Sequence, residues 1–244
     1  MKISEVKTIG ESLAQRVSNG DMDNAISLLN PILVDRTPFS SLDRIGGSLE
    51  DLPLDNIYTF LDRLASDRYM GAWVVIGSAL GAQLDRDFNG ALSRCKKYII
   101  LSDVWYGADI LGERVPGPAL CSDFNNALNI LSAWRIDSNR WVRRAVGVSV
   151  HYWAKKSKGS KLQTKRAVEL LNFIAPIFTE WEMDAAKGIG WGLKTMGKFY
   201  PDNLTNWLME ILSDQQLRYR AIMVRKSITY LPESNKVEIL NIIS

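Results

Sequence analysis

The chain has 244 residues, of which 46% are hydrophobic and 23% are charged, a composition typical of a globular protein with a sizeable core. Two cysteines and a single histidine, His151, favour neither a disulfide framework nor a dedicated zinc site. No run approaches the roughly 20 apolar residues of a membrane span, and the N-terminal segment carries acids where a secretory signal would be apolar. We therefore expect a cytoplasmic protein with no metal, cofactor or membrane partner.

Nearly every segment has the periodicity of an amphipathic helix, and no segment alternates clearly as a strand does. Breaks are predicted where turn residues gather, as at Arg36–Pro38, Gly46–Gly47 and Val115–Pro118. The predicted helices, in chain order, span residues 2–17, 22–33, 53–65, 68–83, 87–100, 103–113, 118–134, 139–156, 163–179, 182–199, 202–212, 215–231 and 234–243.

A related pattern recurs along these helices. Its copies begin at Tyr69, Trp105, Trp141, Asp184 and Leu217, the first three at intervals of 36 residues, and each follows another predicted helix. Helix pairs that recur at about 35–45 residues are typical of HEAT-like solenoids, in which stacking buries faces that no single pair could bury. We therefore predict an all-α, HEAT-like repeat solenoid of stacked antiparallel helix pairs with a concave basic face.

The predicted solenoid forms one domain over residues 1–244. It has divergent N-terminal helices over 1–60, repeats over 61–232 and a C-terminal capping helix over 233–244, and we expect a monomer. Large apolar residues at helical spacing should form the core. They include Trp73, Trp134, Trp153, Trp181 and Trp207.

The net charge of +3 is distributed unevenly. Between Arg135 and Arg166 there are ten Lys and Arg residues and one acid, Asp137, so this window carries +9 and the rest of the chain −6. Such a run can be an ordinary solvated face. Its strength also favours a polyanionic partner.

Asp109 is an unusual residue for an apolar helix, because its own helix places no cation near it. Equivalent positions of stacked repeats lie about 10 Å apart. Counted from the repeat starts, Trp105 has offset 0, Asp109 +4, Arg144 +3, Lys187 +3 and Trp191 +7. Offsets 0, 3, 4 and 7 share one helix face, so these side chains should line the concave surface, with Arg144 as the cation for Asp109.

This stripe has two interpretations. It could be an ion pair between repeats, with two tryptophans that merely pack. Burying such a pair is often no better than apolar packing, however, and the basic window beside it favours a binding site. A cationic groove with one carboxylate between two indole rings suits a polyanionic substrate that has a local positive centre.

Three segments in order resemble the AlkD-type DNA alkylation repair family. WYGAD, at Trp105–Asp109, resembles the family's Trp-x-x-x-Asp. RWVRRAVGVSVHYW resembles its helix with an essential arginine, which falls on Arg144. KGIGWGLKTMGKFYPD resembles the KAIGW segment and contains Lys187 and Trp191. Between the last two, the loop KSKGSK lengthens the family spacing.

The resemblance implies a DNA glycosylase, without a cofactor, that hydrolyses the N-glycosidic bond of N3- or N7-alkylated purines in duplex DNA during base excision repair. It implies that Trp105, Asp109, Arg144 and Trp191 are catalytic. Around Arg144, we expect backbone phosphates to be held with the support of neighbouring cations. These are Arg143, Arg140 and Lys187.

Two other function classes stay open at this point. A catalytically silent HEAT-like protein that binds DNA structures would share the basic window but would not need Asp109 as an anion. A HEAT-like scaffold for other proteins would instead present an apolar or mixed concave face.

Overall fold

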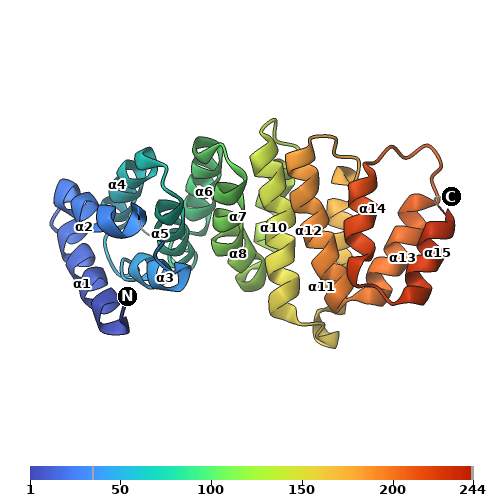
Figure 1. Ribbon diagram of the computed structural model, residues 1–244, viewed down its shortest axis with the longest axis horizontal. Coiled ribbons are helices and arrows are strands. Elements are labelled where there is room, and N and C mark those ends of the chain that lie inside the picture. The colour runs from blue at the N-terminus through green and yellow to red at the C-terminus, as the bar shows by residue number, and fades with distance from the viewer. Residues whose placement is uncertain (35, 243–244) are drawn as a thin grey trace. The chain divides into compact units, whose positions relative to one another are not determined.

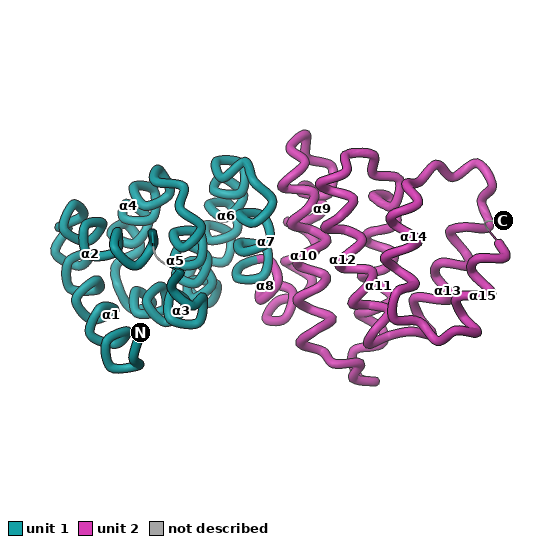
Figure 2. The backbone as a smooth tube through the Cα atoms, viewed as in Figure 1, with its two compact units in different colours: residues 1–115 teal, residues 116–244 magenta. Residues whose placement is uncertain are grey.

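The computed structural model describes residues 1–34 and 36–242, and in this part of the chain the only regular elements are helices (Figure 1). The predicted all-α fold class is therefore confirmed, and the stacking of the helices fits a HEAT-like solenoid. Among these helices, none has the length and apolar character needed to traverse a lipid bilayer. The chain divides into two compact units, Met1–Val115 and Pro116–Ser244 (Figure 2).

Unit 1 stacks its helices in succession. Helices α1, α3, α5 and α7 form one row, in which each contacts the next, and α2 packs on α4 beside that row. Helix α5 lies at the centre, and residues 71–77 are all buried. The elements are α1 (Ile3–Ser18), α2 (Met22–Val34), α3 (Phe39–Gly47), α4 (Leu54–Leu64), the 3₁₀ turn η1 (Ala65–Asp67), α5 (Met70–Gly81), α6 (Phe88–Ser102) and α7 (Trp105–Arg114).

Unit 2 repeats this arrangement. Helices α8, α10, α12 and α14 contact one another in succession, and so do α9, α11, α13 and α15. The elements are α8 (Pro116–Ser122), α9 (Phe124–Arg135), α10 (Arg140–Ser157), η2 (Lys161–Gln163), α11 (Thr164–Ile174), η3 (Ala175–Ile177), α12 (Met183–Phe199), α13 (Pro201–Leu212), α14 (Ala221–Ser227), η4 (Ile228–Tyr230) and α15 (Glu233–Ile242).

Glycines bring α10 and α12 into close contact. A methyl group on Gly147 of α10 would overlap the backbone of Gly188 and Ile189, and one on Gly192 of α12 would lie 2.5 Å from the carbonyl oxygen of Gly147. A methyl group on Gly188 would likewise meet Arg144. The two backbones can therefore approach only because these positions lack side chains, and this contact sets the positions of the residues around it.

Helix α3 was not predicted, because Gly46 and Gly47 were interpreted as a break. Pro38 precedes the helix, where its fixed φ is tolerated. Both glycines lie inside the helix, and a methyl group on Gly46 would come within 2.5 Å of the Val75 carbonyl oxygen of α5. Gly46 therefore serves close helix packing, which sequence alone does not distinguish from a turn.

Two other predicted helices have different bounds. The one over 118–134 is divided because the Asp123 carboxylate caps a new helix, accepting from the Asn126 amide at 3.3 Å. The one over 215–231 begins only at Ala221, so the fifth repeat does not start in a helix at Leu217. Residues 217–220 are not helical, and the ring of Tyr219 lies 5.6 Å from that of Phe178.

Most other predicted helices occur within a few residues of their expected bounds. The helix over 163–179 is shorter, since its last part is the 3₁₀ turn η3. The C-terminal helix over 234–243 corresponds to α15, and residue 243 lies outside the described residues. Four of the five tryptophans expected in the core are buried, but Trp181 is 56% exposed. It lies in the turn before α12, with the Arg220 guanidinium 5.2 Å above its ring.

Replacing Gly147 by Ala should destabilise the protein by about 1–3 kcal/mol, because the new methyl group must push α12 away. This loss should occur although alanine favours helices by about 0.5–1 kcal/mol over glycine. Gly47→Ala is the matched control, since nothing lies within 4 Å of a methyl group there, and it should be neutral or stabilising. Urea unfolding measures both, and equal stabilities of the two variants would contradict the packing argument.

Candidate functional site

Helix α7 carries the predicted Trp and Asp pair of unit 1. It begins directly after α6, through Asp103 in the left-handed conformation at φ 44° and the extended Val104. A methyl group on Gly107 would overlap the buried side chain of Ser102, so the glycine lets α7 start against the end of α6. The buried side of α7 includes Ala108 and Leu111.

Trp105 and Asp109 lie one turn apart on the other side of α7. Trp105 is 54% exposed, and its ring meets that of Tyr106 edge to face, with 5.7 Å between centroids. Asp109 is partly buried. The sequence therefore predicted correctly that these two side chains share a helix face, and the structure shows an accessible indole on the same face as a half-buried carboxylate.

The C-terminal end of α7 is clamped to the rest of unit 1. The Arg114 guanidinium donates two hydrogen bonds to Asp43 of α3, at 2.7 and 3.1 Å. Ser78 of α5 donates to the same carboxylate at 2.5 Å. The Arg114 side chain is only 15% exposed, so this fork fixes α7 against α3 and α5.

In unit 2, Arg144 lies between α10 and α12. It is 7% exposed, and its Nη1 donates to the Asp184 carbonyl at 2.8 Å, near the start of α12. Its side-chain stem fills the space that Gly188 leaves open. Arg144 is thus held in a defined place by both helices.

Trp191 of α12 is held by His151 of α10. The ring of His151 stacks on it, with 4.0 Å between centroids and 27° between planes. Thr195 donates to the Trp191 carbonyl at 3.0 Å, and its oxygen lies 2.6 Å from His151 Nδ1, which we assign as the donor to it. His151 follows Arg144 by seven residues, so both share one face of α10. This spacing could have identified His151 as part of the candidate site.

Arg143, predicted to support the DNA contact, is engaged within unit 2. Its Nε and Nη2 donate to the Glu180 carboxylate at 2.5 and 3.3 Å. Its Nη1 donates to the carbonyls of Asp137 and Ser138. The side chains of Arg143 and Glu180 are 15% and 8% exposed, so this pair ties the start of α10 to the turn before α12.

Arg140 and Lys187 are the predicted cations that remain exposed. Arg140 lies at the start of α10, 3.4 Å from the Asp184 carboxylate, with its guanidinium 4.8 Å above the ring of Trp141. Lys187 lies one turn before Trp191 on α12. Unit 2 therefore groups Arg140, Arg144, Lys187 and Trp191 on neighbouring helices, an arrangement of cations and an aromatic face that suits an anionic partner.

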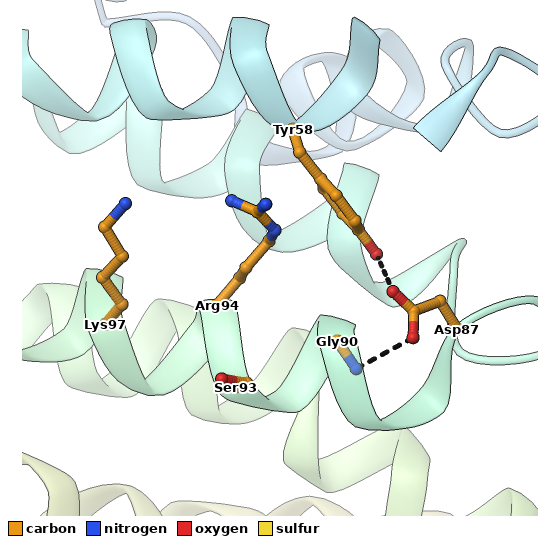
Figure 3. Close-up of a pocket in the computed structure, with 6 residues that line it drawn as sticks. All are labelled: Tyr58, Asp87, Gly90, Ser93, Arg94 and Lys97. Carbon is orange, nitrogen blue, oxygen red and sulfur yellow. Dashed lines mark hydrogen bonds between the residues drawn. The ribbon is translucent and has the colours of Figure 1, made fainter. Parts of the chain in front are cut away.

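A pocket of about 400 Å³ lies elsewhere in unit 1, between α4 and α6 (Figure 3). Tyr58 of α4 donates to the Asp87 carboxylate at 2.7 Å, and Asp87 also caps α6 by accepting from the Gly90 amide. The Arg94 guanidinium lies 4.0 Å above the Tyr58 ring. Burial and the bond to Asp87 both raise the pKa of the Tyr58 phenol, which therefore stays protonated.

The cations of this pocket are neutralised by carboxylates. Asp62 of α4 accepts from Lys97 at 2.7 Å, from Tyr98 at 2.8 Å and from Arg94 at 3.2 Å. Burial alone would raise the pKa of Asp62, but the bonds from Lys97 and Tyr98 outweigh it and lower that pKa. Together with Asp87, Asp62 balances the charges of the two cations. The pocket is therefore lined by polar contacts that join α4 to α6.

Replacing Arg143 by Ala should destabilise the protein by about 3 kcal/mol, because it leaves the Glu180 carboxylate buried without its partner. Arg140→Ala, at a side chain that is 45% exposed, should cost less than about 1 kcal/mol. The double variant R143A/E180Q should recover part of the loss, since a neutral amide replaces the stranded charge. Urea unfolding checks all three, and similar losses for R143A and R140A would refute the structural role of Arg143.

Comparison with curated proteins and with solved structures gives no match. A family model described as DNA alkylation repair enzyme matches residues 45–231, which is well over half of the chain. The match includes α7, α10 and α12, and hence all the candidate residues described above, and it excludes α1 and α2. The chain therefore belongs to the DNA alkylation repair enzyme family.

Proposed function

We propose that this protein is a DNA glycosylase that hydrolyses the N-glycosidic bond of N3- or N7-alkylated purines in duplex DNA. Within the DNA alkylation repair enzyme family, one observation carries this choice: Asp109 presents a partly buried carboxylate one turn from the exposed indole of Trp105. A protein that only binds DNA has no evident use for an anion there, because it would repel phosphates.

The chemistry of the substrate gives this carboxylate a role. Alkylation at N3 or N7 makes the purine cationic and a better leaving group. As the glycosidic bond stretches, positive charge moves to the deoxyribose, where a fixed anion stabilises the oxocarbenium-like state and can orient a water at C1′. Asp109 takes this role, and Trp105 on the same helix offers a π face on which a cationic sugar or base is favoured.

The cations of unit 2 would hold the DNA backbone. Arg140 and Lys187 are exposed and accessible to phosphates, and Arg140 would exchange its 3.4 Å contact with the Asp184 carboxylate for one of them. Arg144 is fixed between α10 and α12, and we assign it the phosphate that lies deepest between these helices. Since Arg143 is already bound to Glu180, we leave it out of the phosphate contacts.

Replacing Asp109 by Asn should slow excision of 7-methylguanine by about 10²–10³-fold, the usual effect of losing one electrostatic contact in a transition state. Binding to undamaged duplex should be unchanged or tighter, because a negative charge is removed. Asp103→Asn is the control, with the same charge change at an exposed turn residue whose left-handed φ asparagine also tolerates. Single-turnover release of the base decides the matter, and equal rates for wild type and D109N would refute the proposal.

Replacing Lys187 by Ala should weaken binding to undamaged duplex and make it less dependent on salt. Loss of one phosphate contact should reduce the slope of log K against log salt by about 0.9. Thermal stability should not change, since the side chain is exposed. Lys7→Ala, at an exposed lysine paired with Glu11, is the control and should leave the slope as it is. An unchanged slope for K187A would argue against this contact.

A further inference from the structure

A second group of cations lies at the far end of α10, where the chain turns into α11. Residues 155–166 contain six basic residues and no Asp or Glu, and all six are exposed. They are Lys155, Lys156, Lys158, Lys161, Lys165 and Arg166. This segment contains the KSKGSK loop.

The turn between the helices has a defined backbone. Lys158 and Gly159 are both left-handed, at φ 49° and 72°, and a methyl group on Gly159 would lie 2.6 Å from the Phe199 carbonyl oxygen. The Ser160 amide closes the turn by donating to the Ser157 carbonyl at 3.0 Å. The cations of α10 and α11 are thus joined by a turn that packs against the end of α12.

Two of these cations line a pocket of about 180 Å³ within unit 2. Lys156 comes from α10 and Arg166 from α11, and the buried Trp153 and the thiol of Cys121 on α8 form other parts of the wall. Ser157 and Gln163 complete the lining. The pocket therefore combines an ammonium, a guanidinium and neutral polar groups around one small space.

Aromatic rings help to position both cations. The Lys156 ammonium lies 5.4 Å from the centre of the Tyr152 ring, and the Arg166 guanidinium lies 5.1 Å from that of Phe124. The Arg166 Nη1 also lies 3.5 Å from the Gln163 side-chain oxygen. These contacts restrict the two side chains before any ligand binds, which lowers the entropy that binding must remove.

Within the described part of the chain, these two cations have no acidic partner. Among residues 1–34 and 36–242, no carboxylate lies within ion-pair distance of Lys156 or Arg166, in contrast to the unit 1 pocket, where Asp62 pairs with Arg94 and Lys97. Their positive charge also acts on the Cys121 thiol in the pocket wall. Burial raises the pKa of this thiol, and the charges of Lys156 and Arg166 partly lower it. The pocket is therefore positive and open to an anion.

The pocket is separate from the phosphate contacts proposed above for Arg140, Arg144 and Lys187. Lys156 follows Arg144 by twelve residues on α10, which is about 120° around the helix and about 18 Å along it. An anion in the pocket therefore contacts another side and another end of α10 than a phosphate at Arg144.

We propose that this pocket is a binding site for a phosphate group, with Lys156 and Arg166 as its ligands. Two cations, a serine and a glutamine around a small space match the charge and hydrogen-bonding needs of phosphate oxygens. One source of this phosphate is the backbone of duplex DNA, and only this source rests on the proposed function. The other source is a free phosphate.

Cys121 reports directly on occupancy of the pocket. Wild-type protein should be alkylated with iodoacetamide, and the modification at Cys121 followed by mass spectrometry. Cys95 is fully buried, so it should stay unmodified and serve as an internal control. We expect millimolar inorganic phosphate, or a short undamaged duplex, to slow alkylation several-fold. Neither ligand should slow it in K156A/R166A.

The same variant should change DNA binding if the phosphate belongs to a duplex. K156A/R166A should bind undamaged duplex several-fold more weakly, with the slope of log K against log salt reduced by about 0.9. The matched control is K7A/R63A, which also removes one lysine and one arginine, both exposed and paired with Glu11 and Asp23. This control should bind DNA as the wild type does.

The outcomes separate the sources and the proposals. Protection of Cys121 by duplex, with a reduced slope in K156A/R166A, assigns the site to the DNA backbone. Protection by inorganic phosphate alone, with an unchanged slope, assigns it to a free phosphate. If neither ligand protects Cys121 and the slope is unchanged, the phosphate site is refuted. These readouts use undamaged DNA, so a failure of base excision by the wild-type protein would leave them valid.

Discussion

The close approach of α10 and α12 is the constraint on which the candidate residues of unit 2 depend. Because Gly147, Gly188 and Gly192 leave no side chain in the contact, backbone meets backbone and the larger neighbours have fixed places. Arg144 fills the space beside Gly188, and His151 of one helix stacks on Trp191 of the other. Three residues without side chains thus set the positions of a cation and an indole that are far apart in sequence.

The basic window of the sequence performs more than one task. Arg143 is held by Glu180, and Arg135 donates to the Phe173 carbonyl at 2.5 Å with its guanidinium 4.9 Å above that ring. These arginines join helices, whereas the lysines near the α10–α11 turn reach solvent. Net charge per segment therefore indicates a polyanionic partner correctly only after the internally paired cations are subtracted.

Much of the fold could be predicted from periodicity and turn residues, because stacked helices need apolar faces at regular spacing. Features set by tertiary contacts could not. The glycines of α3 resemble a break until the nearby Val75 carbonyl of α5 is known, and the division at Asp123 depends on one capping bond. For the site, offsets predicted that Trp105 and Asp109 share a face of α7. No pattern indicated that Arg143 would find Glu180, since that contact depends on the path of the turn before α12.

The clamp at the end of α7 gives the N-terminal helices a function beyond closing the fold. A catalytic charge stabilises a transition state best when it is already in place and does not move during the reaction. Any movement of the anion costs free energy and so reduces the stabilisation of the transition state. Arg114, five residues after Asp109, is anchored to α3 and α5 through Asp43 and Ser78. A substitution in α3 would therefore alter the rigidity with which that carboxylate is presented.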